Sequence, residues 1–195
     1  MEKNKGIVLK TYLPQKCKIV VLDNEIGKIV VVPNRQDISY GACIMYSIRE
    51  QHNCSFIYDI ELIDSPLCLG KDDILFVHHI LELCYYFIPA QSSVSPLFNL
   101  LILLYESRHV FEDSVVKKLF LFKFFTTLGF YPEGQRFQTP YFHILASTSI
   151  DNLIGLTIDL KVEQELDFWL LHCISLHPCI NNFKTVSFLH NNRAV

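Results

Sequence analysis

The hydrophobic periodicity of the chain changes once, near Ser65-Pro66, and this change limits what the chain can fold into. Before this point, apolar residues alternate with polar ones or form short β-branched runs, which is typical of strands. After it, apolar residues recur at helical spacing. The sequence therefore predicts an α+β protein, with a β domain over residues 1–66 and an all-α domain over residues 67–195.

The β part contains five short segments with strand character and no helix-length pattern. Five short strands in about 60 residues favour a small closed barrel of the OB-fold type, and an open five-stranded sheet is the alternative. The clearest alternation lies in the last segment, where Cys54, Phe56, Tyr58, Ile60 and Leu62 are expected to face the core. The five predicted strands are 6–12, 16–23, 27–33, 41–49 and 54–63.

Capping residues mark the helices of the second part. Asp72 is predicted to cap the first, which Pro89 ends, and Ser95-Pro96 opens the second. Asp113 precedes the third, which Gly129 closes. A fourth is predicted over 161–177 and a fifth over 182–190, whereas 133–158 has no clean period and is interpreted as loop or short helix.

Composition and charge narrow the class of protein. Half of the 195 residues are hydrophobic, enough for packed cores, which excludes a disordered chain. The formal net charge of −3 excludes a generally basic nucleic-acid binder. The charge is uneven, however, because residues 1–49 carry +4 and the remainder carries −7. This asymmetry indicates that the N-terminal part meets a polyanion.

The cysteines and the apolar segments indicate the compartment. The seven cysteines are odd in number and form no CxxC pair, which predicts free thiols in a reducing, cytoplasmic setting. The longest uncharged stretch, 83–105, is divided by prolines and polar residues. No piece approaches the ~20 apolar residues of a membrane span, so no membrane association is expected.

Catalytic and metal-binding signatures are missing from the sequence. The motifs GxxxxGK[ST], GxGxxG, GxSxG and HExxH are all absent, so the protein is not expected to be an enzyme. His172, Cys173, His177 and Cys179 offer ligand types for zinc, but a second pair at finger spacing is missing. We therefore predict no metal and no cofactor.

Five basic residues are spread over the first three predicted strands and their turns. On a sheet, lysines two residues apart share a face, and hairpin pairing brings the neighbouring strands' lysines alongside. Such a patch can follow a sugar-phosphate backbone while Tyr12 or Tyr40 stacks bases. The alternative is that these lysines only solvate the barrel. The predicted DNA-binding residues are Lys10, Lys16, Lys18, Lys28 and Arg35.

Several segments, in this order, resemble the RecO family of bacterial recombination mediators. Gly6-Ile-Val-Leu-Lys-Thr11 and the strand beginning Gly27-Lys28-Ile29 are similar to the family's opening OB-fold strands. The segment 119–132 is similar to its helix ending in L-G-Y-x-P, and 183–189 resembles its terminal helix. The family's basic K-G-A-R segment is reduced to Arg35, and no cysteine follows between 133 and 172, where many members carry a four-cysteine zinc module.

The resemblance implies a function and partners. It implies an OB barrel and a helical domain that bind single- and double-stranded DNA, help load recombinase on strands coated with single-strand-binding protein, and anneal complementary strands. The implied protein partners are a RecR-like protein and the acidic tail of single-strand-binding protein. The competing hypothesis is a protein-interaction adaptor that has kept the scaffold and lost most DNA affinity.

Overall fold

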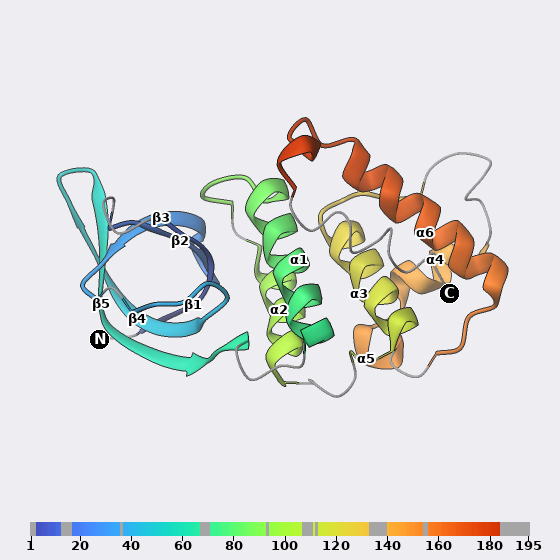
Figure 1. The fold of residues 1–195 in the computed structure, drawn as a ribbon, viewed down its shortest axis with the longest axis horizontal. Helices are drawn as coiled ribbons and strands as arrows, with labels where there is room; N and C mark the ends of the chain where they lie inside the picture. Colours follow the sequence, from blue (N-terminus) through green and yellow to red (C-terminus); the bar gives the residue numbers. More distant parts are fainter. Residues whose placement is uncertain are drawn as a thin grey trace. The chain divides into compact units, whose positions relative to one another are not determined.

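The chain is an α+β protein whose N-terminal β-barrel is followed by helices (Figure 1). The computed structural model describes residues 3–12, 17–35, 37–66, 71–92, 94–106, 111, 113–132, 140–153 and 156–183. The chain divides into two compact units, Met1–Tyr105 and Glu106–Val195. The first unit thus contains the barrel, which ends near the change in periodicity, and also the two helices that follow it.

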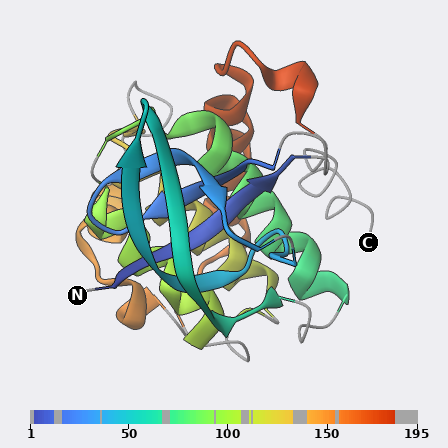
Figure 2. The ribbon, with the colours of Figure 1, turned by 90° about the vertical axis from the view of Figure 1, so that its left-hand side faces the viewer.

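The barrel has the strand order β1-β2-β3-β5-β4 and closes through pairing of β1 with β4 (Figure 2). All neighbours are antiparallel except β3 and β5, which pair in parallel over three residues. This closed five-stranded barrel confirms the predicted OB-type architecture over an open sheet. The strands are β1 (Asn4–Thr11), β2 (Ile19–Asp23), β3 (Gly27–Pro33), β4 (Cys43–Gln51) and β5 (Cys54–Asp64).

The side chains of β5 face differently from the prediction. Ile57 is fully buried in the barrel core, whereas Phe56 and Leu62 are 38% and 61% exposed. Asp59 has a φ of +51°, and Asp59 and Ile60 together oppose a single residue of β4, which is a β-bulge. The bulge lets Ile57 and Ile60, three residues apart, both pack on the core. The predicted inward face was therefore wrong for Phe56 and Tyr58, which lie before the bulge and point outward with Arg49 and Ser47, and Leu62 beyond the bulge is exposed as well.

Helices α1 (Lys71–Phe87) and α2 (Ser95–Glu106) cover the outer face of β1 and β2. Ile19 and Val21 point into the barrel core, yet Val20 and Leu22, which point outward, are also buried. Helix α1 packs on β1, and the Tyr105 hydroxyl of α2 donates to the Gly41 carbonyl over 2.7 Å. A second apolar layer therefore lies between the barrel and these helices.

The second unit is built around α3 (Ser114–Thr127). Ten of its residues are buried, which is typical of a helix surrounded on all sides. It packs against α4 (Pro140–Ser147), α5 (Ile150–Leu153) and α6 (Leu160–Ser175), and a 3-10 turn spans Ile180–Asn182. Helices α4 and α5 lie in the stretch expected to be loop or short helix.

The helix boundaries follow the capping residues closely. Asp113 accepts from the Val115 amide over 2.7 Å at the start of α3, and Gly129 has a φ of +89° at its end. The amides of Gly129 and Phe130 bond to carbonyls of the last turn in the Schellman pattern. Helix α1 begins at Lys71, so Asp72, predicted to precede the helix as its cap, is instead its second residue. The predicted helix over 182–190 falls mostly outside the described residues.

Candidate nucleic-acid interface

A hollow of about 300 Å³ lies at one end of the barrel, where β1 ends, β2 begins and β3 ends. We call it the rim hollow. It brings together Lys18 and Arg35 of the predicted basic set, with Tyr12 beside them. Both basic side chains are exposed and Tyr12 is half-buried. The residues that line the rim hollow are Thr11, Tyr12, Cys17, Lys18, Ile19, Pro33, Asn34, Arg35 and Ile38.

Arg35 is held in place at the rim. Its guanidinium forms an ion pair with Asp37, and it also donates to the Ile60 carbonyl over 3.5 Å. Hydrogen bonding to Asp37 raises the pKa of Arg35, and the same bond lowers the pKa of Asp37. A phosphate at this site would meet an oriented, permanently charged donor, with Asp37 as its competitor.

Lys10 and Lys28 lie at a different place, around Tyr85 of α1. The Lys10 ammonium is 4.4 Å from the Tyr85 ring centroid and 3.3 Å from its hydroxyl. The Lys28 ammonium donates to the Tyr85 carbonyl over 2.6 Å and lies 5.5 Å from the same ring. These two lysines thus meet at Tyr85 of α1, whereas the sequence analysis expected hairpin pairing to bring them alongside Lys16 and Lys18. We call Lys10, Lys28, Tyr12 and Tyr85 the Tyr85 cluster.

The electrostatics of the Tyr85 cluster indicate a cationic but partly enclosed site. Burial lowers the pKa of Lys28. Burial also raises the pKa of Tyr85, but hydrogen bonds with Lys10 and Tyr12 and the two lysine charges outweigh it and bring the pKa below its ordinary value. Tyr12 belongs to both sites, since it lines the rim hollow and is hydrogen-bonded to Tyr85.

The other sequence candidates have separate positions. Lys16 lies outside the described residues. Tyr40 donates its hydroxyl to the His78 carbonyl over 3.3 Å, and its ring meets the His78 ring edge-on at 5.0 Å. Because both its ring and its hydroxyl pack on α1, Tyr40 is poorly placed to stack a base.

Sequence reasoning missed the basic residues at the start of β1. A second, more open hollow of about 430 Å³ shares Arg35 and Asn34 with the rim hollow and includes Lys3. Lys3 forms an ion pair with Glu61 over 2.5 Å. Its charge contributed to the N-terminal excess, but no local pattern links residue 3 to a loop thirty residues away.

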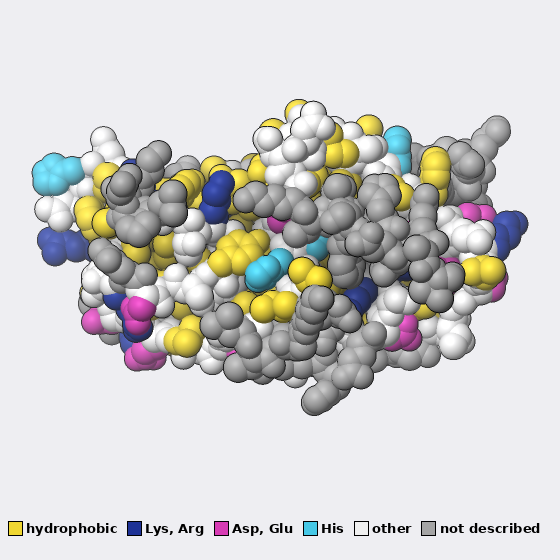
Figure 3. All heavy atoms as spheres, in the orientation of Figure 1, with side chains coloured by type: hydrophobic (Ala, Val, Ile, Leu, Met, Phe, Trp, Pro, Cys, Tyr) yellow, Lys and Arg dark blue, Asp and Glu magenta, His cyan; other side chains and the backbone are white. Residues whose placement is uncertain are grey.

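Charge on the surface is mixed. On the face in Figure 3, Lys and Arg side chains lie beside Asp and Glu at the barrel end, and hydrophobic side chains lie between them. A polyanion on this face of the barrel would therefore meet single cations beside carboxylates and not a continuous basic patch.

The described part of the chain contains no group of three or more His, Cys, Asp or Glu side chains that could hold a metal. Cys173 is buried, which raises the pKa of its thiol to about 12, and the His177 ring lies 5.5 Å from the Phe183 ring. Among the described helices, none combines the length and the apolar character that crossing a bilayer requires. No protein-family model and no curated protein matches the chain.

Proposed function

We propose that the protein binds DNA through the rim hollow and acts as a recombination mediator of the RecO type, which helps load recombinase on strands coated with single-strand-binding protein and anneals complementary strands. The observation that carries the proposal is the meeting of Lys18, Arg35 and Tyr12 at the end of an OB-type barrel. Oligonucleotides bind OB barrels at the β1–β2 loop and the neighbouring strands.

The chemistry of the rim hollow fits a single strand. Two cations neutralise backbone phosphates, which gives affinity without base specificity. An aromatic side chain beside them offers a face on which an unpaired base stacks. Mediator activity requires no bond-making residue, because it consists of holding strands and exchanging proteins. Selection of the coated strand falls to the proposed partners, a RecR-like protein and the acidic tail of single-strand-binding protein.

The test is annealing of complementary strands coated with single-strand-binding protein. The wild-type chain should accelerate annealing, and the variant Lys18→Gln/Arg35→Gln should lose most of that acceleration. Lys161→Gln, which removes an exposed charge from α6, is the control and should anneal as fast as wild type. Equal annealing by wild type and the rim variant would contradict the proposal.

The alternative function, a protein-interaction adaptor with little DNA affinity, is favoured by one observation. Three of the described basic candidates already have partners within the chain, namely Lys10 and Lys28 at Tyr85 and Arg35 at Asp37. The adaptor hypothesis predicts that wild-type protein binds no DNA at low salt and still captures a RecR-like protein.

A further inference from the structure

The outer face of β1, β4 and β5 carries a second set of basic and aromatic side chains. Tyr46 and Ile48 of β4 point into the barrel core, so the residues between and beside them point outward. Lys5 pairs with Met45 on this outer side, and Arg49 pairs with Phe56. Directly opposed residues of an antiparallel pair point the same way, so these four side chains share one surface.

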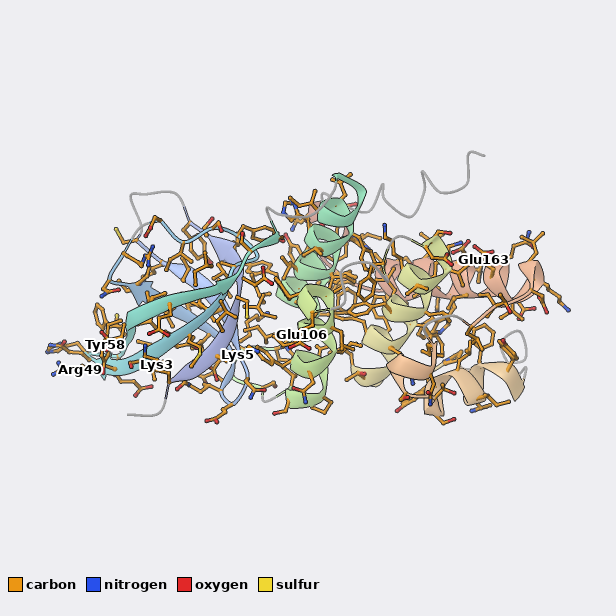
Figure 4. All side chains as sticks on the ribbon, turned by 90° about the horizontal axis from the view of Figure 1, so that it is seen from below. Lys3, Lys5, Arg49, Tyr58, Glu106 and Glu163 are labelled. Carbon is orange, nitrogen blue, oxygen red and sulfur yellow. The ribbon has the colours of Figure 1, made fainter. Side chains whose placement is uncertain are left out.

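Two further residues complete this surface. Tyr58 pairs with Ser47, and continuing the β1–β4 register by one residue places Lys3 opposite Ser47 as well. We call the set Lys3, Lys5, Arg49, Phe56 and Tyr58 the β1–β4–β5 face. Figure 4 shows the labelled Arg49, Tyr58, Lys3 and Lys5 along the barrel on the side seen from below.

The cations of the β1–β4–β5 face are more available than those of the Tyr85 cluster. Among the described residues, Lys3 is ion-paired with Glu61, whereas no such pair involves Lys5 or Arg49. Arg49 and Phe56 are exposed, and Tyr58 is half-buried. Basic side chains interleaved with aromatic ones are the pattern that tracks a single strand.

The β1–β4–β5 face is continuous with the rim hollow. Arg35 lines the rim hollow and also the second hollow, and Lys3 lines that second hollow. The second hollow thus joins Arg35 to Lys3 of the face, and a phosphate there would compete with Asp59 and Glu61, which line the same hollow.

The opposite side of the barrel is closed to such a ligand. Val20 and Leu22, which point outward from β2, are buried. The lysines on that side are engaged with Tyr85. A strand bound at the rim hollow therefore has an exit across β1, β4 and β5.

We propose that the β1–β4–β5 face binds the continuation of the DNA single strand whose first nucleotides occupy the rim hollow. Phosphates lie on Lys3, Lys5 and Arg49, and a base stacks on Tyr58. This inference rests on the proposed function and extends it by giving the bound strand a path. Met45 to Arg49 spans about 13 Å of strand, the length of roughly four stacked nucleotides.

The experiment compares a short and a long oligonucleotide on the full chain. Oligo-dT of about 6 and about 16 nucleotides spans the range of OB-fold site sizes. For Lys5→Gln/Arg49→Gln we expect the long oligonucleotide to bind with a log–log salt slope flatter by about 1.4, since each phosphate contact contributes about 0.7. The short oligonucleotide should bind this variant with the same affinity and salt slope as it binds the wild-type protein. Tyr58→Leu should weaken only the long oligonucleotide, roughly tenfold.

The outcomes separate this inference from the proposed function. The control is Lys161→Gln, with unchanged binding of both lengths expected. If wild type binds both oligonucleotides and the face variants leave the long one's affinity and slope unchanged, the path is overturned and the rim hollow stands. Equal losses for both lengths also overturn it, because the face would then be part of the first contact. Wild-type protein that binds neither length overturns both proposals.

Discussion

At the scale of single residues, the turn between β2 and β3 accepts only glycine at position 27. Gly27 has a φ of +87°, and a Cβ there would lie 1.9 Å from the Ser92 carbonyl oxygen. Gly129, at the end of α3, has a similar φ of +89° but open space around its Cβ position. A side chain at Gly129 would meet only the cost of left-handed backbone, whereas a side chain at Gly27 would also clash with Ser92. Comparing the two positions therefore separates these two effects.

We expect Gly129→Ala to lower the free energy of unfolding by about 1 kcal/mol, the cost of left-handed conformation for an L-residue. Gly27→Ala should cost at least twice that, because the turn must also move away from Ser92. Urea denaturation followed by circular dichroism measures both. Equal losses of unfolding free energy for the two variants would mean that the β2–β3 turn moves away from Ser92 at no cost.

Trp169 anchors α6 on α3. Its side chain is 2% exposed, and its ring lies 5.0 Å from Phe122 and 6.1 Å from Phe125. We expect Trp169→Ala to cost roughly 3 to 5 kcal/mol of unfolding free energy, because the emptied space cannot refill. The neighbouring Phe168, 43% exposed, is the matched control, and Phe168→Ala should cost much less. Comparable losses of unfolding free energy for the two variants would contradict the claim that Trp169 anchors α6 on α3.

His79 makes the first unit sensitive to acid. It is buried in α1, and burial lowers its pKa from 6.5 to about 4. Since the folded pKa lies below the unfolded one, its contribution is complete above pH ~6.5 and is lost as the pH falls toward 4, up to roughly 3 kcal/mol. The unfolding free energy of His79→Leu should fall less than that of wild type over this window, and parallel pH profiles would contradict the assignment.

Whether a residue's environment could be predicted from the sequence depends on whether its cause lies in neighbouring residues. The burial of Trp169 could be predicted because its own neighbours, Phe168, Leu170 and Leu171, are apolar. The roles of Lys10 and Lys28 could not be predicted, because their ammonium groups donate to the hydroxyl and to the backbone carbonyl of Tyr85, a residue more than fifty positions from either.

At the scale of elements, one buried cation joins α3 and α6. The Lys118 ammonium lies 2.6 Å from Glu163 and 2.9 Å from Asp167, and its side chain is 8% exposed. Burial lowers the pKa of Lys118, but the bonds to the two carboxylates outweigh it and raise the pKa overall. Either carboxylate alone therefore leaves the ammonium with one anionic partner.

We expect Glu163→Gln or Asp167→Asn alone to cost about 1 kcal/mol, and the double variant about 3 kcal/mol or more, because it strands a buried charge. Adding Lys118→Met to the double variant should restore much of the loss, since apolar replacement of a buried ionic group is often neutral. Urea denaturation followed by Trp169 fluorescence measures each step. Additive losses without rescue would show that Lys118 is adequately solvated.

Elements were predicted where their signals are local and missed where register matters. Asp113 and Gly129 bracket α3 because caps act within one turn. The orientation of β5 was missed because a single bulged residue, Asp59, shifts the alternation and leaves Phe56 outside. A period-two pattern does not reveal a bulge. The residues of the β1–β4–β5 face could therefore not be predicted without the strand register.

At the scale of the whole molecule, the fold class follows from the single change of periodicity, and the site follows only in part. Lys18 and Arg35 meet at the rim hollow because β2 begins where β3 ends, a consequence of their hairpin. The covering of the β1–β2 face by α1 and α2 depends on tertiary packing. Because the helices cover that face, the proposed DNA path runs across β1, β4 and β5 instead.

The central claim is that cations at the rim hollow contact DNA phosphates, and the salt dependence of single-stranded DNA binding tests it most directly. The full chain is titrated with oligo-dT at several salt concentrations, for wild type, Lys18→Gln and Lys161→Gln. The plot of log affinity against log salt should be linear, and Lys18→Gln should flatten it by about 0.7. Lys161→Gln should leave the slope unchanged, and both variants should melt as wild type does, because exposed charges contribute little to stability. Wild-type protein without measurable binding at low salt, or a Lys18→Gln variant with the wild-type slope, would contradict the claim.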